Sequence, residues 1–197
     1  MNFVKLHLPN RDEILEYSNK FNTEENYKRY RLQENVLKKL FISIPDNKDF
    51  EGIYLKVKLL NQFYSTNIYD IIPVVEKILN ANIDDKLEYE YESKNLVDSI
   101  RMIKFRENKK TWDLYSFTTK YLSFHKPNYY PIYDSYISKL LCNYKKQGII
   151  NFKNLRDYSE FKNIITDLRK MLNLENHSYK DFDLYLWMFA KEHLNNK

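Results

Sequence analysis

Glycine is scarce in this chain: only Gly52 and Gly148 occur among 197 residues, together with five prolines. A sandwich or barrel of many short strands needs frequent tight turns, and glycine and proline supply most of them. Apolar residues also recur every three or four positions over long stretches, which is the spacing of one face of a helix. The sequence therefore predicts an all-α fold of roughly eight to ten helices and no strand.

The apolar stripes place the predicted helices over most of the chain. Their ranges are 24–42, 50–64, 68–80, 93–106, 111–125, 135–147, 157–172 and 179–194. Thr23, Ser93 and Thr111 stand where helix N-caps are expected, and Gly148 stands where a helix should end. Pro73 interrupts the 68–80 stripe, so that helix either starts about three residues before the proline or is kinked there.

Composition and charge narrow the class of protein. Hydrophobic residues make up 43% and charged residues 30%, which is typical of a soluble globular protein. The net charge of +5 is compatible with a nucleic-acid partner. Cys142 is the single cysteine, which excludes an internal disulfide and favours a cytoplasmic location. We expect no signal peptide and no membrane span, because no stretch reaches about 18 uncharged apolar residues.

The predicted helix 111–125 carries a polar line between two apolar stripes. Asp113, Ser116, Lys120 and Ser123 follow one another at steps of three, four and three. A polar line on an otherwise buried helix faces a cleft, a partner or a hydrogen-bond network. Lys120 is therefore a candidate catalytic lysine. Alternatively, its ammonium reaches solvent or pairs with an acid.

Asp134 stands at the start of the next helix, after a short loop that contains a proline. An aspartate in this position is expected to cap the helix by accepting backbone N–H groups. Capping would also orient the carboxylate and keep it ionised, which suits catalysis. Tyr129, Tyr130, Tyr133 and Tyr136 surround it in sequence, either as an aromatic wall or as core residues.

Residues 101–110 form a basic run, with Arg101, Lys104, Arg106, Lys109 and Lys110 against Glu107. Such a run before a helix N-terminus can clamp phosphate groups, or it can be a solvated turn. The four histidines, His7, His125, His177 and His193, show no metal-ligand spacing. No Gly-rich phosphate loop occurs either, so we expect neither a metal nor a cofactor.

Three stretches resemble the helix-hairpin-helix DNA glycosylase superfamily, particularly its 8-oxoguanine glycosylase-like branches. They are LLNQFYSTNIYDIIPVVEKIL (59–79), FTTKYLSFHKPNYYPIYDSYISKLL (117–141) and DFDLYLWMFAKEHL (181–194). The resemblance implies a single two-lobed helical domain over residues 1–197. That domain would have a cleft between two helical subdomains and a hairpin region at about 93–125. Asp134 matches the family's catalytic aspartate.

The resemblance also implies roles for other residues. A loop that fills the gap left by a flipped base would contain Gln62, Tyr64, Ser65, Thr66 and Asn67. Further DNA contacts would come from Arg101, Lys104, Lys109, Lys110 and Thr111, and the base pocket from Tyr133, Tyr136, Tyr185 and Trp187. A lysine that attacks C1′ would be Lys110 or Lys120, although the family's hairpin glycines are replaced by RENKKT at 106–111.

The resemblance thus predicts a monomeric DNA glycosylase that flips and removes a damaged or modified base from double-stranded DNA, in repair or antiviral defence. Asp134 would stabilise the oxocarbenium character of the sugar and orient water. A second hypothesis is a DNA- or protein-binding module on the same scaffold without chemistry. A third is a helical protein unrelated to DNA, whose charge reflects coding bias.

Overall fold

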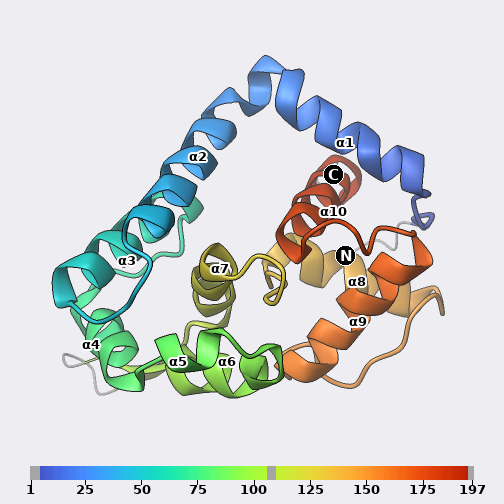
Figure 1. The fold of residues 1–197 in the computed structure, drawn as a ribbon. Helices are drawn as coiled ribbons and strands as arrows, with labels where there is room; N and C mark the ends of the chain where they lie inside the picture. Colours follow the sequence, from blue (N-terminus) through green and yellow to red (C-terminus); the bar gives the residue numbers. More distant parts are fainter. Residues whose placement is uncertain (1–4, 106–109, 195–197) are drawn as a thin grey trace. The chain divides into compact units, whose positions relative to one another are not determined.

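The computed structural model describes residues 5–105 and 110–194 (Figure 1). The chain divides into two compact units, Met1–Arg29 with Pro131–Lys197 (unit 1) and Tyr30–Tyr130 (unit 2). The described residues form ten α-helices, two short 3₁₀ helices and two strands. The prediction of a mostly helical protein is confirmed, but the prediction of no strand is wrong.

Unit 1 is built around the C-terminal helix. It contains α1 (Arg11–Thr23), η1 (Glu25–Tyr27), α8 (Ser135–Lys146), α9 (Tyr158–Met171) and α10 (Tyr179–Leu194). Helix α10 packs on both α1 and α8. The ring of Phe189 meets that of Tyr17 edge to face at 6.1 Å. Gly148 ends α8 as predicted, with a φ of +71°. Its N–H and that of Ile149 donate to carbonyls of the last turn, so a left-handed glycine closes the helix.

Unit 2 holds the central chain segment. Its elements are most of α2 (Lys28–Ser43), α3 (Phe50–Tyr64), α4 (Ile72–Ala81), α5 (Asp84–Leu87), η2 (Glu90–Glu92), α6 (Ser93–Arg101), β1 (Met102–Lys104), β2 (Thr111–Asp113) and α7 (Tyr115–His125). Helix α7 is buried along its length from Phe117 to Phe124, which confirms that it is a central helix. It packs on α3 and α6.

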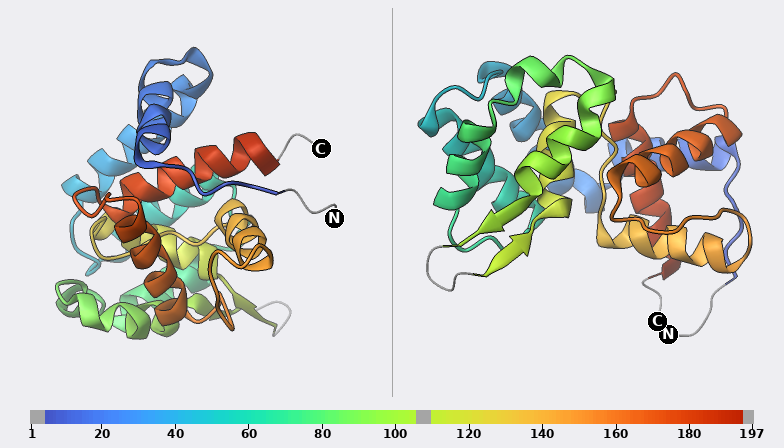
Figure 2. Two further views of the ribbon diagram at one scale, coloured as in Figure 1. Left: turned by 90° about the vertical axis from the view of Figure 1, so that its right-hand side faces the viewer. Right: turned by 90° about the horizontal axis from the view of Figure 1, so that it is seen from below.

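The segment between α6 and α7 differs from its prediction. We expected a helix to about Arg106 and a new helix capped by Thr111, but α6 ends at Arg101 and α7 begins at Tyr115. An antiparallel pair of strands lies between them, with Ile103 opposite Trp112 (Figure 2). Isoleucine, threonine and tryptophan favour strands, and here this local preference outweighs the helical spacing of the apolar residues.

The N-terminal region also differs. Helix α1 was not predicted, because its only buried residues are Ile14, Tyr17 and Phe21, a sparse stripe in a polar segment. Asn10 caps it by accepting from the Glu13 N–H at 2.9 Å. Thr23 is the last residue of α1 and does not cap α2.

Helix α4 starts at Ile72, so Pro73 lies in its first turn. The helix thus begins one residue before the proline, later than the expected start about three residues before it, because a proline costs no hydrogen bond in a first turn.

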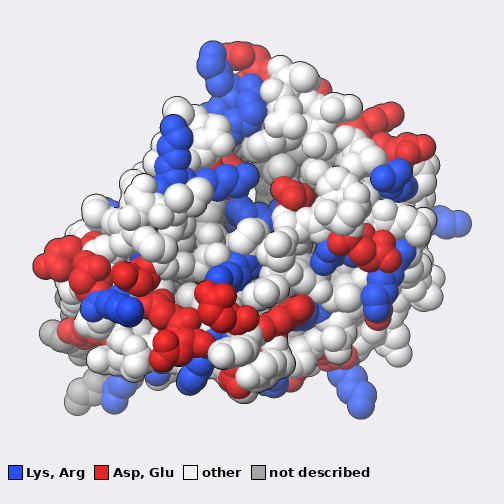
Figure 3. Space-filling model, viewed as in Figure 1, with Lys and Arg blue, Asp and Glu red and all other residues white. Residues whose placement is uncertain are grey.

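Unit 2 has one acidic face. Red side chains gather over the region of α5 and α6 (Figure 3). The exposed acids there include Asp85, Glu88 and Glu90, and the nearby Tyr91 is 76% exposed. The positive net charge of the whole chain is therefore unevenly distributed, because this face of unit 2 is acidic. Within the described ranges, no helix combines the length and apolar character that a membrane crossing requires.

Candidate functional site

Asp134 is the N-cap of α8, as the sequence predicted. Its Oδ1 accepts a hydrogen bond from the backbone N–H of Ile137 at 2.9 Å. The Asp134 carbonyl accepts from the Ser138 N–H at 2.9 Å. No hydrogen-bond partner of Oδ2 occurs in the described part of the chain. The carboxylate is thus held by one oxygen and keeps the other available.

The residues before Asp134 are anchored by α8 and α9. The ring of Tyr133 meets that of Phe161 edge to face at 5.4 Å, and its hydroxyl donates to Ser138 Oγ at 3.2 Å. The buried Tyr158 hydroxyl donates to the Pro131 carbonyl at 3.4 Å. Aromatic packing on both sides fixes the backbone that carries Asp134. Tyr133 therefore packs against the core of unit 1 while remaining half-buried.

Two predicted pocket residues, Tyr136 and Trp187, lie together. Tyr136 is on the first turn of α8 and Trp187 is on α10, and their ring centroids are 6.2 Å apart. Lys139 Nζ lies 5.7 Å from the Tyr136 ring, and Lys191 Nζ lies 4.7 Å from the Trp187 ring. We call these four residues the aromatic–lysine cluster. It combines ring faces with ammonium groups, which is a composition suited to bases and phosphates.

Tyr185, the fourth predicted pocket residue, has a different environment. It is 5% exposed, and its ring meets that of His177 at 5.9 Å. Burial raises the pKa of its hydroxyl, a hydrogen bond with Ser18 opposes that change, and the charge of Asp181 adds to it. The side chain therefore belongs to the interior of unit 1.

Lys120 lies in unit 2 and is 4% exposed. Its Nζ donates to Ser116 Oγ at 2.6 Å and lies 5.5 Å from the Tyr64 ring. The predicted polar line is shorter than expected, since Asp113 belongs to β2. This environment agrees better with a lysine that belongs to a hydrogen-bond network than with a nucleophile that is open to substrate.

The predicted gap-filling loop follows α3 and is ordered by the side chain of Asn61. Asn61 Oδ1 accepts from Thr66 Oγ1 at 2.7 Å and from the Ile68 N–H at 3.1 Å. Tyr64 is half-buried and donates to Glu34 at 3.0 Å. Three of the predicted contact residues point outward as exposed side chains: Gln62, Ser65 and Asn67.

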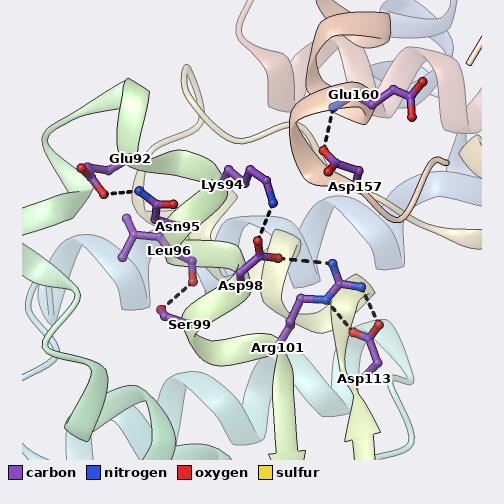
Figure 4. A network of polar contacts seen from close by, with 10 residues as sticks. All are labelled: Glu92, Lys94, Asn95, Leu96, Asp98, Ser99, Arg101, Asp113, Asp157 and Glu160. Carbon is purple, nitrogen blue, oxygen red and sulfur yellow. Dashed lines mark hydrogen bonds and ion pairs between the residues drawn. The ribbon is translucent and has the colours of Figure 1, made fainter. Parts of the chain in front are cut away.

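The basic run separates into buried and exposed residues. Arg101 is 8% exposed; its Nε and Nη2 donate to Asp113 at 2.8 and 2.5 Å (Figure 4). Its guanidinium also lies 4.1 Å from the Tyr115 ring, so this side chain is held inside unit 2. Lys104, Lys110 and Thr111 are exposed on or beside the strands. The predicted contact Lys109, like Arg106, lies outside the described residues. The expected helix N-terminus at Thr111 is wrong, because Thr111 is on a strand and α7 begins at Tyr115.

A buried polar network in unit 2 was not predicted. Lys56 on α3 is completely buried, and its Nζ donates to the carbonyls of Ile44 and Asp46 and to Asn47 Oδ1. The Asn47 N–H and Nδ2 donate to the Asp84 carboxylate at 2.8 and 2.6 Å. Burial lowers the pKa of Lys56 to about 8. One sequence signal was present, since Lys56 falls within the apolar stripe of α3 between Ile53 and Leu60.

His125 lies beside this network. Its ring centroid is 4.7 Å from that of Phe41 and 5.1 Å from that of Tyr121. Burial, together with the positive charges of Lys56 and Lys126, lowers the pKa of His125 to about 3. The imidazole is therefore neutral at physiological pH. As for metal binding, the described side chains contain no group of three or more His, Cys, Asp or Glu that could hold an ion.

Comparisons with known proteins match the chain to a family model and to a relative. The family model HI_0787_N, described as an N-terminal domain, matches residues 13–129, which include α2 to α7 and most of α1. A Haemophilus influenzae protein, described as uncharacterized, is 32% identical over 150 residues, which cover 75% of this chain and 70% of that protein. No solved structure matches the chain significantly.

Proposed function

The chain belongs to the HI_0787_N family, and we propose that it is a DNA glycosylase whose catalytic carboxylate is Asp134. One observation carries the proposal. Asp134 is fixed at the start of α8 by a single oxygen, two residues before the first ring of the aromatic–lysine cluster. A carboxylate oriented in this way, near surfaces that suit bases and phosphates, is what hydrolysis of an N-glycosidic bond requires.

The chemistry follows from the charge that develops on the sugar. As the bond to the base lengthens, the deoxyribose gains oxocarbenium character, and the Asp134 carboxylate stabilises this positive charge. The oxygen not used for capping can orient the water that attacks C1′. The leaving base, flipped out of the duplex, would stack on Tyr136 or Trp187.

We assign hydrolysis, rather than attack by a lysine, to this site. Lys120 is buried and donates to Ser116, so its ammonium is already engaged inside unit 2. A Schiff-base nucleophile must lose its proton and reach C1′. The proposed enzyme therefore needs no lysine for base release and leaves an abasic site.

Double-stranded DNA with a damaged or modified base is the proposed substrate. Exposed residues of unit 2 that the sequence linked to DNA are Gln62, Ser65, Asn67, Lys104, Lys110 and Thr111. Lysine ammonium groups on such a surface bind backbone phosphates and make affinity fall with salt.

Base release tests the proposal directly. A panel of duplexes with different oxidised, alkylated and hypermodified bases is incubated with protein, then treated with hot alkali to cleave at abasic sites. We expect cleavage of one class of duplex by wild type and none by Asp134→Asn. Asp157→Asn is the matched control, because Asp157 caps α9 in the same way, accepting from the Glu160 N–H at 3.1 Å. Equal base release by wild type and Asp134→Asn would refute the proposal.

A binding module without chemistry is the second candidate, and one observation favours it. The segment between α6 and α7 is a strand pair, where the glycosylase resemblance predicts a helical hairpin. If the protein is such a binding module, it binds DNA with an affinity that falls with salt, and no duplex loses a base. The variants Asp134→Asn and Asp157→Asn then behave alike.

A further inference from the structure

The strand pair of unit 2 presents an aromatic side chain to solvent. Trp112 on β2 is 40% exposed, and Met102 on β1 is 47% exposed. The residue opposite Trp112 in the register, Ile103, is 2% exposed and faces the core. Directly opposite residues of an antiparallel pair lie on the same face, so Trp112 is beside Ile103, which anchors the strands to the core, while its own ring remains partly in water.

One basic side chain lies beside the exposed ring. Lys110 Nζ lies 5.9 Å from the Trp112 ring, whereas Lys104, opposite Thr111 in the register, is exposed on the other face of the strand pair. The Phe105 ring meets the indole edge to face at 5.9 Å and supports it from one side. This arrangement sets the ring apart from the scattered exposed apolar residues that are normal on protein surfaces.

The base of the strand pair is held rigidly. The Leu114 N–H donates to the Arg101 carbonyl at 2.8 Å, and the Arg101 guanidinium pairs with Asp113 on β2 (Figure 4). Lys94 and Asp98 extend the network on α6, with Nζ to Oδ2 at 2.7 Å. These contacts hold the backbone on both sides of the strand pair, so little backbone conformational entropy is lost when Trp112 binds a partner.

We propose that Trp112 stacks on an unpaired base of a DNA strand, while Lys110 binds an adjacent phosphate. A base stacks on an indole whatever its identity, since every base has a π face, and the ammonium group of Lys110 complements the phosphate charge. The proposal rests on the proposed function only in taking DNA as the partner. It adds a contact in unit 2 that is separate from Asp134.

Binding to a labelled oligothymidylate strand, followed by fluorescence anisotropy, tests the contact. Stacking on an aromatic residue is worth about 1–3 kcal/mol per base, so Trp112→Ala should weaken binding by about 5- to 140-fold. Trp112→Phe should retain most of the affinity. Lys110→Ala should lower the magnitude of the slope of log K against log salt by about 0.7. Tyr91→Ala, which removes a 76% exposed ring on the acidic face, should change nothing.

A spectroscopic readout separates stacking from structural support. The chain has two tryptophans, so the variant Trp187→Phe leaves Trp112 as the single indole. Its fluorescence should be quenched when oligothymidylate binds, and far-UV circular dichroism should show that Trp112→Ala retains the fold. Unchanged fluorescence on binding, or equal affinity of folded Trp112→Ala and wild type, would overturn the proposal.

The two proposals fail in different ways. If wild type releases a base and Trp112→Ala binds DNA as tightly as wild type does, the proposed glycosylase activity of Asp134 is supported and the stacking contact is refuted. If no duplex loses a base but Trp112→Ala still weakens binding, the stacking contact stands and the glycosylase activity is refuted.

Discussion

Lys56 and Tyr121 share one acceptor in the core of unit 2, the side-chain oxygen of Asn47. The lysine donates to it at 2.8 Å and the tyrosine hydroxyl at 2.5 Å. Asn47 lies in the segment between α2 and α3, and the two donors come from α3 and α7. One amide therefore links three parts of the unit through hydrogen bonds that water does not reach.

Replacing Lys56 with methionine should destabilise the protein by about 2–4 kcal/mol. Methionine keeps much of the volume, but it leaves the carbonyls of Ile44 and Asp46 and the oxygen of Asn47 without this donor. Urea unfolding measures the change. Lys58→Met on the same helix is the control, because Lys58 is exposed and should change stability by less than about 0.5 kcal/mol. Equal losses in the two variants would contradict a role for the network.

His125 should make the protein sensitive to acid. Its folded-state pKa is lowered from 6.5 to about 3, mainly by burial, so the unfolded chain binds a proton that the folded chain does not. The free energy of unfolding should therefore fall as pH drops from about 6.5 toward 3, by up to about 1.4 kcal/mol per pH unit. The variant His125→Phe has a ring that suits the aromatic neighbours Phe41 and Tyr121. Its free energy of unfolding should lack this contribution to the pH dependence.

Urea unfolding of wild type and His125→Phe at about pH 7 and about pH 5 measures the difference, because carboxylates that titrate in this range contribute equally to both proteins. Parallel pH profiles would show that the folded and unfolded chains protonate His125 with the same pKa, and would contradict this prediction.

The regular helices could be predicted because each carries a long apolar stripe. The range of α3 was predicted to the residue, and α10 likewise. The strand pair could not, because three-residue strands are shorter than any window in which periodicity can be recognised. It also depends on Arg101 reaching Asp113, a pairing that forms only in the folded unit.

The candidate site was predictable in part for similar reasons. Asp134 could be identified as a cap, since capping depends on neighbours within one helical turn. The meeting of Tyr136 with Trp187 depended on how α8 packs on α10, and only the glycosylase resemblance suggested it. The acceptors of Lys56 lie outside its helix, in a segment with no regular pattern, so sequence spacing gives no indication of them.

Arg101 and Asp113 should show strong coupling in a double-mutant cycle. Removing one partner takes away two charge-assisted hydrogen bonds, although Arg101 keeps its contact with Asp98 at 3.6 Å, so Arg101→Met and Asp113→Asn should each cost about 1.5–3 kcal/mol. The double variant should cost less than the sum of the two, because neither charge then remains. Lys94→Met, at a pair in which both side chains are over 40% exposed, should cost less than about 1 kcal/mol. Additive losses in thermal or urea unfolding would refute the coupling.

The two glycines should respond differently to alanine. A Cβ added to Gly52 would lie 2.8 Å from Ile44 Cγ2 and 2.9 Å from Asp49 Oδ2, closer than real contacts allow. Gly52→Ala should therefore cost about 1–3 kcal/mol through overpacking. Gly148→Ala meets no atom within 4 Å but has a φ of +71°, so it should cost roughly 1–2 kcal/mol through backbone strain alone.

A second-site change distinguishes the two mechanisms. Ile44→Ala removes the Cγ2 atom that the new methyl group would meet, so it should be less destabilising in the Gly52→Ala background than in wild type. The same change should be purely additive with Gly148→Ala, whose site has no neighbour to relax. Urea midpoints of the single and double variants measure both outcomes. Additivity at Gly52 would mean that the close approach of Ile44 to α3 does not limit this position.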